Sequence, residues 1–452
     1  MIQTNLQTLA NGLRVVCVEM PHLHSVELAI YLKVGGRNDP PGREGLSHFL
    51  EHMLFRGTAE YPSSLAIESA FEVIGGAPNA ATDAESTYYY SRVHPDNVRT
   101  ALEIFASMLM RPLLTGIEIE RRIIAEEARE DLNEQEDEVN ADTIVSRMLW
   151  PRHPLGMPTI GTLESIAAIG REDLEGHLNN YYIPGNGVLV VSGPIGSDAV
   201  FASAEACFGQ WPSRKVLQPI PVTVRHQAPQ IRCVQDSDSQ MNLQMAFLGF
   251  ARDDHRFMAL RFLRRILAGG GSSRLHLRLR EELGIIYSVD GSIGAYDETG
   301  CLAFDLSTAP ATLIAAVEAT FEELLRMVTT PVPEAELSRI GNSYVFDLEF
   351  SRDSACEMGG RYGWGELMGV VRSIEEDQED SRRITAADVQ RTARELFAPE
   401  NLRLVAVGPW KRGMKKALRE QVADYQQRYC DAVASGCQPV PVKLPAGFED
   451  GG

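Results

Sequence analysis

An internal repeat constrains the fold of this chain more than any other feature of its 452 residues. A stretch that begins at Ser165 aligns without a gap with a stretch that begins at Asp380; the two read SIAAIGREDLEGHLNNYYIPGNGVLVVSGP and DSRRITAADVQRTARELFAPENLRLVAVGP. Each copy predicts a capped amphipathic helix, then a turn that contains proline, then a buried strand. Because two copies this similar indicate two halves of one fold, we expect two homologous domains of roughly 200 residues each.

The domain boundary is expected in the segment WPSRKVLQPIPVTVRHQAPQ, whose prolines a continuous helix would not tolerate. We therefore predict a first domain at 1–212, a linker at 213–228 and a second domain at 229–452. Helices are predicted at 98–111 and 312–328, among alternating strands such as VELAIYLKVG and CLAFDLST. The pattern of CLAFDLST is more typical of an antiparallel than of a buried parallel strand. Each half is predicted to be an α+β sandwich, a mainly antiparallel sheet with helices on one face.

The composition excludes several classes of protein. The formal net charge of −19 argues against nucleic acid as a partner, because phosphate binding needs a basic face. An acidic surface could favour basic ligands, but an acidic globular protein carries such a charge without any ligand. Scattered cysteines with no C-x-x-C pair favour ordinary buried thiols over a disulfide framework. We expect a cytoplasmic protein without membrane association, since the N-terminus lacks export-signal features and no apolar run could span a bilayer.

Residues 42–57, GREGLSHFLEHMLFRG, predict a helix with two histidines and a glutamate on one side. Ser47 or Glu44 is expected to cap this helix, which should continue through Phe55. Five apolar side chains form one contiguous stripe for packing against a sheet: Leu46, Phe49, Leu50, Met53 and Leu54. The histidines and the glutamate avoid this stripe, which argues against ordinary core histidines.

The side opposite the stripe carries His48, Glu51 and His52 in the pattern H-x-x-E-H. Two imidazoles at i and i+4 can bind one zinc ion, and a carboxylate on the same turn can reach a water on that ion without being a ligand. Zinc lowers the pKa of its water, and the carboxylate takes the proton as hydroxide attacks a carbonyl. This pattern is the inverzincin signature, but so short a motif needs support from a third ligand.

A carboxylate from elsewhere in the chain is the usual third ligand of a catalytic zinc. The predicted helix IEIERRIIAEEAREDL, at 117–132, offers several candidates. Ile123 and Ile124 are expected to mark its buried side, and Glu127 lies four and three residues after them. Glu120 lies one heptad before Glu127 on the same side. Spacing alone leaves open whether Glu127 is a ligand or part of a solvated acidic helix.

Several linked motifs resemble those of the M16 zinc metallopeptidases, which include pitrilysin, insulinase and the mitochondrial processing peptidase. They are G-x-S-H-F-L-E-H-M-x-F-R-G, ER-x-I-I-x-E-E, HPLGMPTIGTLESI at 153–166 and LAGGGSSRLHLRLREELGIIYSV at 267–289. The resemblance covers the full length of the chain. It implies two domains with the LuxS/MPP-like metallohydrolase fold. Because the largest relatives join four such domains, the chain resembles the half-length M16B-type branch.

The resemblance implies a metal centre. His48, His52 and Glu127 match the zinc ligands of the family, and Glu51 matches its general base. Glu120 matches a further glutamate that supports the site. One Zn²⁺ per chain is therefore expected.

The resemblance also implies residues that bind the substrate. Asn79 and Ala80 match the strand that holds an extended substrate by backbone pairing. Arg278 and Tyr287 match an arginine and a tyrosine that hold the substrate carbonyl and the developing oxyanion. Arg280 is left open as the alternative to Arg278, because the spacing to the tyrosine varies between branches.

The implied activity is that of a zinc metalloendopeptidase. Its expected substrates are peptides or small unfolded polypeptides enclosed in a dimeric chamber, where zinc activates a water and Glu51 acts as general base. A homodimer with two sites is the first expectation, and a heterodimer with an M16 paralogue is left open. The alternative is a non-catalytic structural or partner subunit of an M16-type complex, but such relatives lose a motif histidine or glutamate that this chain keeps.

Overall fold

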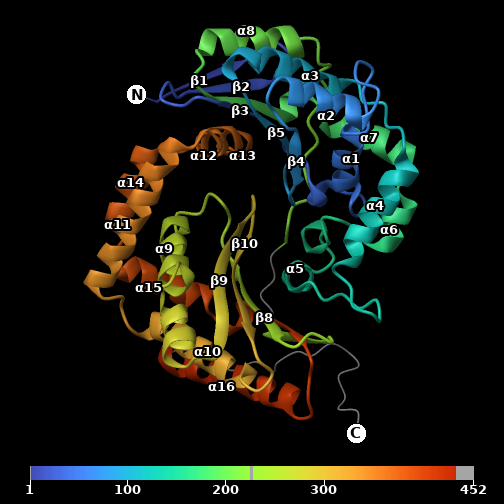
Figure 1. Ribbon diagram of the computed structural model, residues 1–452. Coiled ribbons are helices and arrows are strands. Elements are labelled where there is room, and N and C mark those ends of the chain that lie inside the picture. The colour runs from blue at the N-terminus through green and yellow to red at the C-terminus, as the bar shows by residue number, and fades with distance from the viewer. Residues whose placement is uncertain (1, 224–227, 434–452) are drawn as a thin grey trace. The chain divides into compact units, whose positions relative to one another are not determined.

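The chain forms two compact units. The structure is a computed structural model that describes residues 2–223 and 228–433 (Figure 1). The first unit contains Met1–Glu130, Met157–Ile220 and Asp347–Glu376, and the second contains Asp131–Gly156, Pro221–Phe346 and Asp377–Gly452. The change between units after Ile220 lies within the linker predicted at 213–228.

Each unit also contains one segment from the other half of the sequence. Residues 131–156 belong to the predicted first domain but pack in the second unit, and residues 347–376 do the reverse. A division into 1–212 and 229–452 does not include this exchange. Its cause is tertiary packing, which neither composition nor periodicity reveals.

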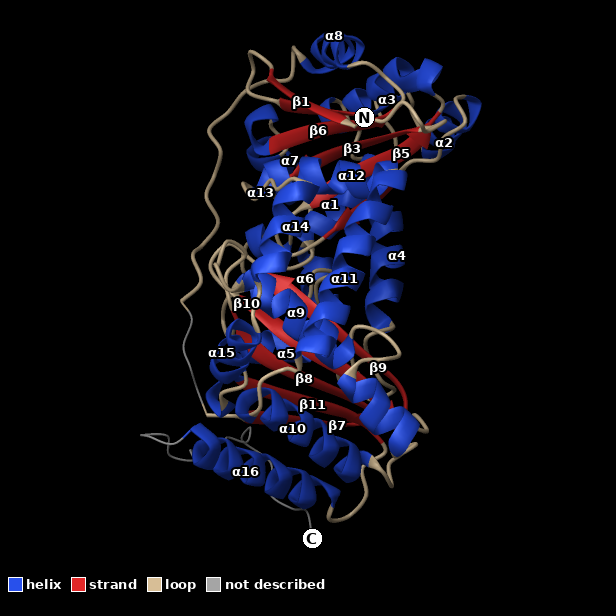
Figure 2. Cartoon of the chain, turned by 90° about the vertical axis from the view of Figure 1, so that its left-hand side faces the viewer, coloured by secondary structure: helices blue, strands red, loops and turns tan. Residues whose placement is uncertain are grey.

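A six-stranded mixed sheet forms the centre of the first unit (Figure 2). Its spatial order is β1-β2-β6-β3-β5-β4. Strands β2 and β6 run parallel, and the other neighbouring pairs are antiparallel. The strands are β1 Gln3–Thr8, β2 Arg14–Glu19, β3 Val26–Leu32, β4 Asn79–Thr82, β5 Thr87–Val93 and β6 Gly187–Gly193.

A five-stranded sheet of the same design forms the centre of the second unit. Its order is β7-β11-β8-β10-β9, and β7 and β11 run parallel. Strand β10 is antiparallel to both β8 and β9, which confirms the prediction for CLAFDLST. The strands are β7 Gln230–Gln235, β8 Met241–Gly249, β9 Ile286–Ala295, β10 Gly300–Thr308 and β11 Leu402–Gly408.

Helices surround both sheets. In the first unit they are α1 Leu46–Leu54, α2 Ser64–Val73, α3 Val98–Met110, α4 Ile117–Arg129, α6 Leu163–Ala168, α7 Arg171–Tyr181, α8 Ser197–Phe208, α12 Ala355–Gly359 and α13 Gly365–Met368. In the second unit they are α5 Ala141–Leu149, α9 Phe257–Ala268, α10 Leu313–Thr329, α15 Ala386–Leu396 and α16 Met414–Val433. Helices α11 Glu334–Phe350 and α14 Ile374–Arg383 each cross a unit boundary. The predictions of helices at 98–111 and 312–328 are confirmed by α3 and α10.

The internal repeat is confirmed by matching elements. Helix α7 and strand β6 in the first copy correspond to α15 and β11 in the second. The Asp173 carboxylate accepts a hydrogen bond from the Gly170 N–H at 2.8 Å, and Asp388 accepts one from Thr385 at 3.0 Å. Both strands lie between a parallel and an antiparallel neighbour. The two copies therefore occupy the same place in two similar sheets.

The first sheet carries helices on both faces. On one face, α1, α3, α7 and α8 share a hydrophobic core with strand residues such as Leu28 and Ile30. On the other, a helical turn at Gly360–Trp364 approaches so closely that a Cβ on Gly363 would lie 2.7 Å from the Val190 side chain. The α+β class is confirmed, and the exchanged segment adds a layer that the one-sided prediction lacks.

The cysteines depart from the expectation of ordinary buried thiols. Cys17 and Cys233 are buried free thiols, but the free thiol of Cys356 is exposed. Cys430, near the end of α16, is disulfide-bonded. The prediction is therefore wrong for Cys356 and Cys430, because sequence spacing reveals neither the exposure of a thiol nor whether it is paired.

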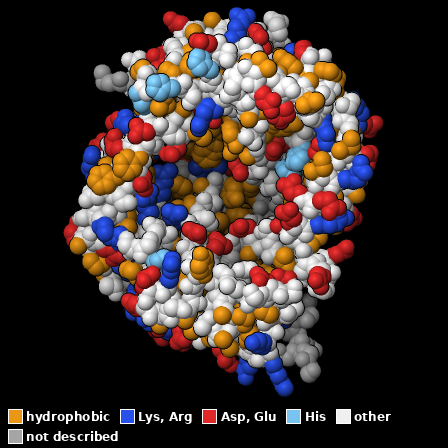
Figure 3. Space-filling model, in the orientation of Figure 1, with side chains coloured by type: hydrophobic (Ala, Val, Ile, Leu, Met, Phe, Trp, Pro, Cys, Tyr) orange, Lys and Arg blue, Asp and Glu red, His pale blue; other side chains and the backbone are white. Residues whose placement is uncertain are grey.

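Charged side chains of both signs are interspersed over the face shown in Figure 3. Every helix of the described residues is too short or too polar to cross a membrane.

Candidate metal centre

The apolar side of α1 fixes this helix in the first unit. Its five stripe residues are each at most 2 % exposed and belong to the core: Leu46, Phe49, Leu50, Met53 and Leu54. The predicted faces of the helix are therefore confirmed. His48, Glu51 and His52 lie away from this stripe, where side chains from other elements can reach them.

The N-terminus of α1 is capped from a distance, so the prediction of Ser47 or Glu44 as the cap is wrong. Gly45 precedes the helix with φ of 90° and, as a glycine, has no side chain that could cap it. Instead, the Asp39 carboxylate accepts hydrogen bonds from the N–H groups of Gly45 at 2.8 Å and Ser47 at 3.0 Å. The Ser47 hydroxyl donates to Asp39 and lies 2.9 Å from His177 Nε2. Ser47 is already inside the helix, where its own side chain cannot cap the first turn.

The loop that contains the motif HPLGMPTIGTLESI braces the same helix end. Gly45 and Gly161 both have positive φ, of 90° and 91°. A Cβ on Gly45 would lie 2.3 Å from the Ile160 carbonyl oxygen, and one on Gly161 would lie 2.3 Å from the Glu44 carbonyl oxygen. Glycine is therefore required at both positions for the loop to contact the helix.

His177 is a neutral partner of this buried cap. Its Nε2 lies 3.9 Å from Asp39 Oδ1, and burial lowers the pKa of His177 to about 3. The pKa in the unfolded chain is about 6.5, so only the unfolded chain takes up a proton between the two values. The contribution of His177 to stability is thus present above about pH 6.5 and is lost as the pH falls toward about 3.

We expect His177 to destabilise the fold as the pH falls from 7 to 5, while Asp39, with its raised pKa, acts in the opposite direction over the same interval. A buried histidine with this pKa lowers the free energy of unfolding by about 2 kcal/mol at pH 5 relative to pH 7. A His177→Gln variant should therefore lose less stability over the same interval in scanning calorimetry. Asp39, whose pKa burial raises to about 7, is present in both proteins, so the difference reports on His177. An equal fall in both proteins would contradict this role.

Three side chains from α1 and α4 converge in one place. His48 Nε2 lies 3.8 Å from Glu127 Oε1, and His52 Nε2 lies 3.9 Å from Glu127 Oε2. One ligand atom from each residue lies within 4.8 Å of the others. Tetrahedral zinc holds nitrogen and oxygen ligands about 3.3 Å apart, so small shifts are enough for these residues to fit it. Within the described residues, this is the only group of three such side chains placed to hold a metal ion.

The protonation of the two histidines affects metal binding. Burial lowers the pKa of His48 to about 4, so its imidazole is neutral at pH 7, as a metal ligand must be. Burial also lowers the pKa of His52, but its hydrogen bond with Glu120 and the surrounding carboxylates outweigh burial and raise it.

Glu51 connects α1 to the edge of the sheet. It is 8 % exposed, and burial raises the pKa of its carboxyl group. Thr82 Oγ1 donates a hydrogen bond to Glu51 Oε2 at 2.5 Å. Thr82 ends β4, the edge strand that also contains the predicted substrate-binding residues Asn79 and Ala80. Sequence reasoning missed Thr82, although residues two apart in a strand share a face.

The sequences around these residues match two family models. Residues 14–163, which contain the whole cluster, match the model described as insulinase (peptidase family M16). Residues 168–344 match the model described as peptidase M16 inactive domain. The chain belongs to the M16 peptidase family.

Proteins of similar length resemble this chain over most of its residues. It is 29 % identical over 405 residues to YmxG of Bacillus subtilis, which covers 89 % of this chain and 97 % of that protein. It is 29 % identical over 425 residues to Rv2782c of Mycobacterium tuberculosis, and this match covers 92 % of this chain and 95 % of that protein. Both are named uncharacterized zinc proteases. A solved protease structure from Helicobacter pylori, 21 % identical, covers 90 % of this chain and 100 % of its own with a TM-score of 0.83, so the fold is shared.

In this M16 chain, helix α4 supplies the remaining candidate ligand. The helix ends at Arg129, before the predicted end at 132. Ile124 is buried as predicted, but Ile123 is 46 % exposed, so the prediction that both mark the buried side is wrong. The buried line runs instead through Glu120 and Ile124, four residues apart on the helix. The Glu127 side chain is 45 % exposed.

Glu120 holds the second nitrogen of His52. The His52 Nδ1–H donates to Glu120 Oε2 at 3.1 Å, which turns Nε2 toward Glu127. Arg56, a residue that sequence reasoning missed, forms an ion pair with the same Glu120 carboxylate. Burial raises the pKa of Glu120, but its bonds to His52 and Arg56 outweigh burial and lower it. By contrast, His48 Nδ1 is buried and has no hydrogen-bond partner among the described residues.

A Glu120→Gln substitution is expected to weaken zinc binding by roughly 10- to 100-fold, the usual effect of losing a carboxylate behind a metal-binding histidine. The affinity can be measured by competition with a chromogenic chelator. Glu118→Gln is a matched control, because Glu118 lies on the same helix and its side chain is 79 % exposed. Equal zinc affinity in the two variants would exclude a supporting role for Glu120.

The other predicted site residues lie in the second unit. Arg278, in a π-helical turn at His276–Glu282, forms ion pairs with Glu282 at 3.0 Å and Glu322 at 3.4 Å. Arg280 lies 3.8 Å from Glu281, and Tyr287 on β9 is 78 % exposed. The structure thus brings together the first-unit residues of the predicted site, and the roles of Arg278, Arg280 and Tyr287 stay predictions.

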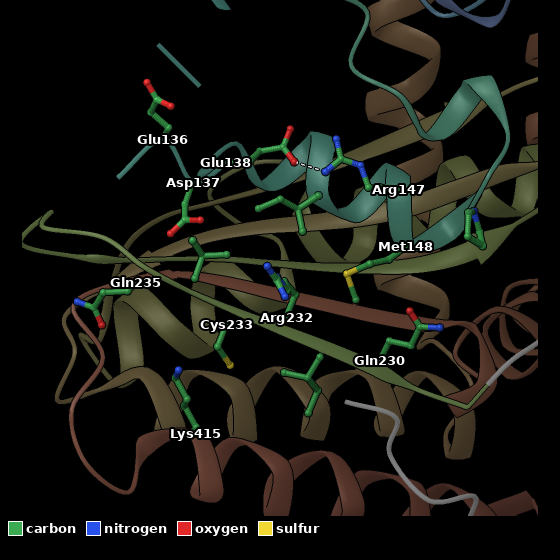
Figure 4. Close-up of a pocket in the computed structure, with 14 residues that line it drawn as sticks. Glu136, Asp137, Glu138, Arg147, Met148, Gln230, Arg232, Cys233, Gln235 and Lys415 are labelled. Atoms are coloured by element: carbon green, nitrogen blue, oxygen red, sulfur yellow. Dashed lines mark hydrogen bonds and ion pairs between the residues drawn. The ribbon is translucent and has the colours of Figure 1, made fainter. Parts of the chain in front are cut away.

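A cavity of about 770 Å³ in the second unit is separate from this centre (Figure 4). The cavity lies along the edge strand β7 and is lined by residues of α5 and by Lys415 of α16. An ion pair of 2.6 Å joins Glu138 and Arg147 within it. Its lining residues do not include the candidate metal ligands, so it is not part of the metal centre.

Proposed function

We propose that the chain is a zinc-dependent endopeptidase that hydrolyses peptides or small unfolded polypeptides. The observation that carries this proposal is the convergence of His48, His52 and Glu127 beside the Glu51 carboxylate, with a free strand edge next to it. The names of the B. subtilis and M. tuberculosis relatives agree with a zinc protease. An extended peptide that pairs with β4 would lie next to Glu51.

The donor set of this site suits zinc. Two imidazole nitrogens and one carboxylate are a usual catalytic set, which leaves a position for water or substrate. Zinc, when bound, supplies Lewis acidity, which lowers the pKa of a water molecule and polarises a peptide carbonyl. His48, His52 and Glu127 would hold the ion, and Glu120 would orient His52.

Glu51 would move the proton in this reaction. Its carboxylate can take a proton from the attacking water and return it to the departing amine. Burial raises the pKa of the Glu51 carboxyl group. A group that first accepts and later donates a proton works best when its pKa lies near the working pH. Asn79 and Ala80 would position the peptide backbone, because β4 pairs with β5 on one side only.

The proposal includes a dimeric chamber. Arg278 or Arg280, with Tyr287, would bind the substrate carbonyl and the developing negative charge as hydrogen-bond donors. They would come from the second half of a partner chain, either a second copy or an M16 paralogue. The exposure of the Tyr287 side chain leaves its hydroxyl available for such a role.

Metal analysis and peptide cleavage together test this function. We expect about one zinc ion per purified chain, the usual occupancy of a three-ligand catalytic site. Cleavage of a quenched fluorescent peptide should stop after chelation and return when zinc is added. Bound zinc without cleavage, also in the presence of an M16 paralogue, would favour the non-catalytic subunit. A chain that binds no zinc would contradict the proposal.

A further inference from the structure

The Glu51 carboxylate is held by one hydroxyl group. Thr82 Oγ1 donates to Glu51 Oε2 at 2.5 Å, a length typical of a hydroxyl bonded to an ionised carboxylate. No second hydrogen bond to Glu51 is found among residues 2–223 and 228–433. Since a hydroxyl has a single proton, the bond occupies Oε2 and leaves Oε1 for a water molecule.

The Thr82 hydroxyl is itself fixed in place. Thr82 pairs with Thr87 across the β4–β5 ladder. The Thr87 hydroxyl, which donates to the Val34 carbonyl at 2.9 Å, lies 3.4 Å from Thr82 Oγ1. The turn between the strands is closed by the Asp83 N–H, which donates to the Ser86 carbonyl at 2.7 Å. Thr82 therefore has little freedom to turn away from Glu51.

Strand geometry connects Thr82 to the expected substrate. Successive side chains of a strand alternate between its faces, so Ala80 and Thr82 share the face toward α1. Ala80 packs against the core that contains the α1 stripe, which agrees with this placement. A peptide added to the outer edge of β4 would lie roughly 4.8 Å from this strand. Movement of β4 on binding would thus be transmitted to Glu51 through one hydrogen bond.

We propose that Thr82 is a positioning residue, which presents one oxygen of Glu51 to the attacking water and couples that orientation to the occupancy of β4. The inference rests on the proposed peptidase function and extends it. Without the hydroxyl, the carboxylate can rotate, so the proton acceptor is correctly placed for a smaller fraction of the time. The expected defect lies in the chemical step and not in metal binding.

Thr82→Val tests this role, because valine keeps the shape of threonine and removes the hydroxyl. Loss of one hydrogen bond to a charged group predicts a fall in kcat of roughly 10- to 100-fold. KM, zinc content and thermal midpoint should stay within about twofold or a few degrees of wild type. Thr82→Ser should restore most of kcat. Thr4→Val, on the exposed strand β1, is the matched control and should leave kcat unchanged.

A double-mutant cycle with Glu51→Gln separates positioning from a structural effect. If Thr82 acts through the carboxylate, Thr82→Val should lower the residual rate of Glu51→Gln by much less than it lowers the wild-type rate. Equal losses in both backgrounds, or a Thr82→Val enzyme with unchanged kcat, would overturn the proposal. Zinc-dependent cleavage by the wild type is measured first, so failure of the peptidase function is distinguished from failure of this inference.

Discussion

Replacing Glu51 with glutamine is expected to lower kcat for peptide hydrolysis by roughly 100- to 10,000-fold, the range in which a general base contributes. Glutamine has nearly the shape of glutamate, and its amide can still accept the hydrogen bond from Thr82. It cannot take a proton from water at neutral pH. The loss should therefore appear in kcat, while the zinc content stays that of the wild type.

The measurement is steady-state cleavage of a quenched fluorescent peptide, with zinc determined on the same samples. Glu126→Gln is the matched control, because Glu126 lies on α4 beside Glu127 and its side chain is 75 % exposed. That variant removes one negative charge near the site but no proton acceptor, so its rate should stay close to wild type. A Glu51→Gln enzyme that retains more than half of the wild-type kcat would exclude Glu51 as the base.

Replacing His52 with alanine is expected to remove both zinc and activity. His52 is one of two imidazoles that face Glu127, and the Glu120–Arg56 pair holds its ring in place. Its loss leaves two protein ligands, fewer than a catalytic zinc site needs. Zinc affinity should fall by more than the roughly 10- to 100-fold typical of an outer carboxylate.

Zinc content after dialysis, measured by elemental analysis, checks this prediction together with the cleavage rate. His24→Ala is the control, because His24 is an exposed histidine outside the cluster. The control should bind zinc and cleave peptide like the wild type. Full zinc occupancy in His52→Ala would show that the metal is bound elsewhere.

The repeat and the faces of α1 could be predicted because both depend on local periodicity. Leu46 and Phe49 are buried where the helical period of the sequence places them, and α7–β6 matches α15–β11 residue by residue. The position of Glu127 beside the histidines required the family resemblance, since spacing on α4 left a solvated helix equally open. Its approach to His48 and His52 depends on how α4 packs against α1.

What could not be predicted depends on contacts between segments that are separate in the sequence. Asp39 caps α1 from outside the helix, and Arg56 completes the Glu120 pair from beyond its other end. Thr82 approaches Glu51 only because the β4–β5 hairpin packs beside α1. None of these residues belongs to a motif with its partner, so a search for patterns along the chain passes over them.

The exchange of segments 131–156 and 347–376 between the two units affects the order of folding during synthesis. The ribosome must produce residues 347–376 before the first unit can acquire the helical layer on its second face. A nascent chain that has just passed the linker therefore holds an incomplete first unit, while residues 131–156 still await the sheet on which they pack. Each half of the sequence therefore contains a segment that packs in the unit formed mainly by the other half. A gene divided at the linker would encode two fragments, each exposing the surface that its missing segment covers.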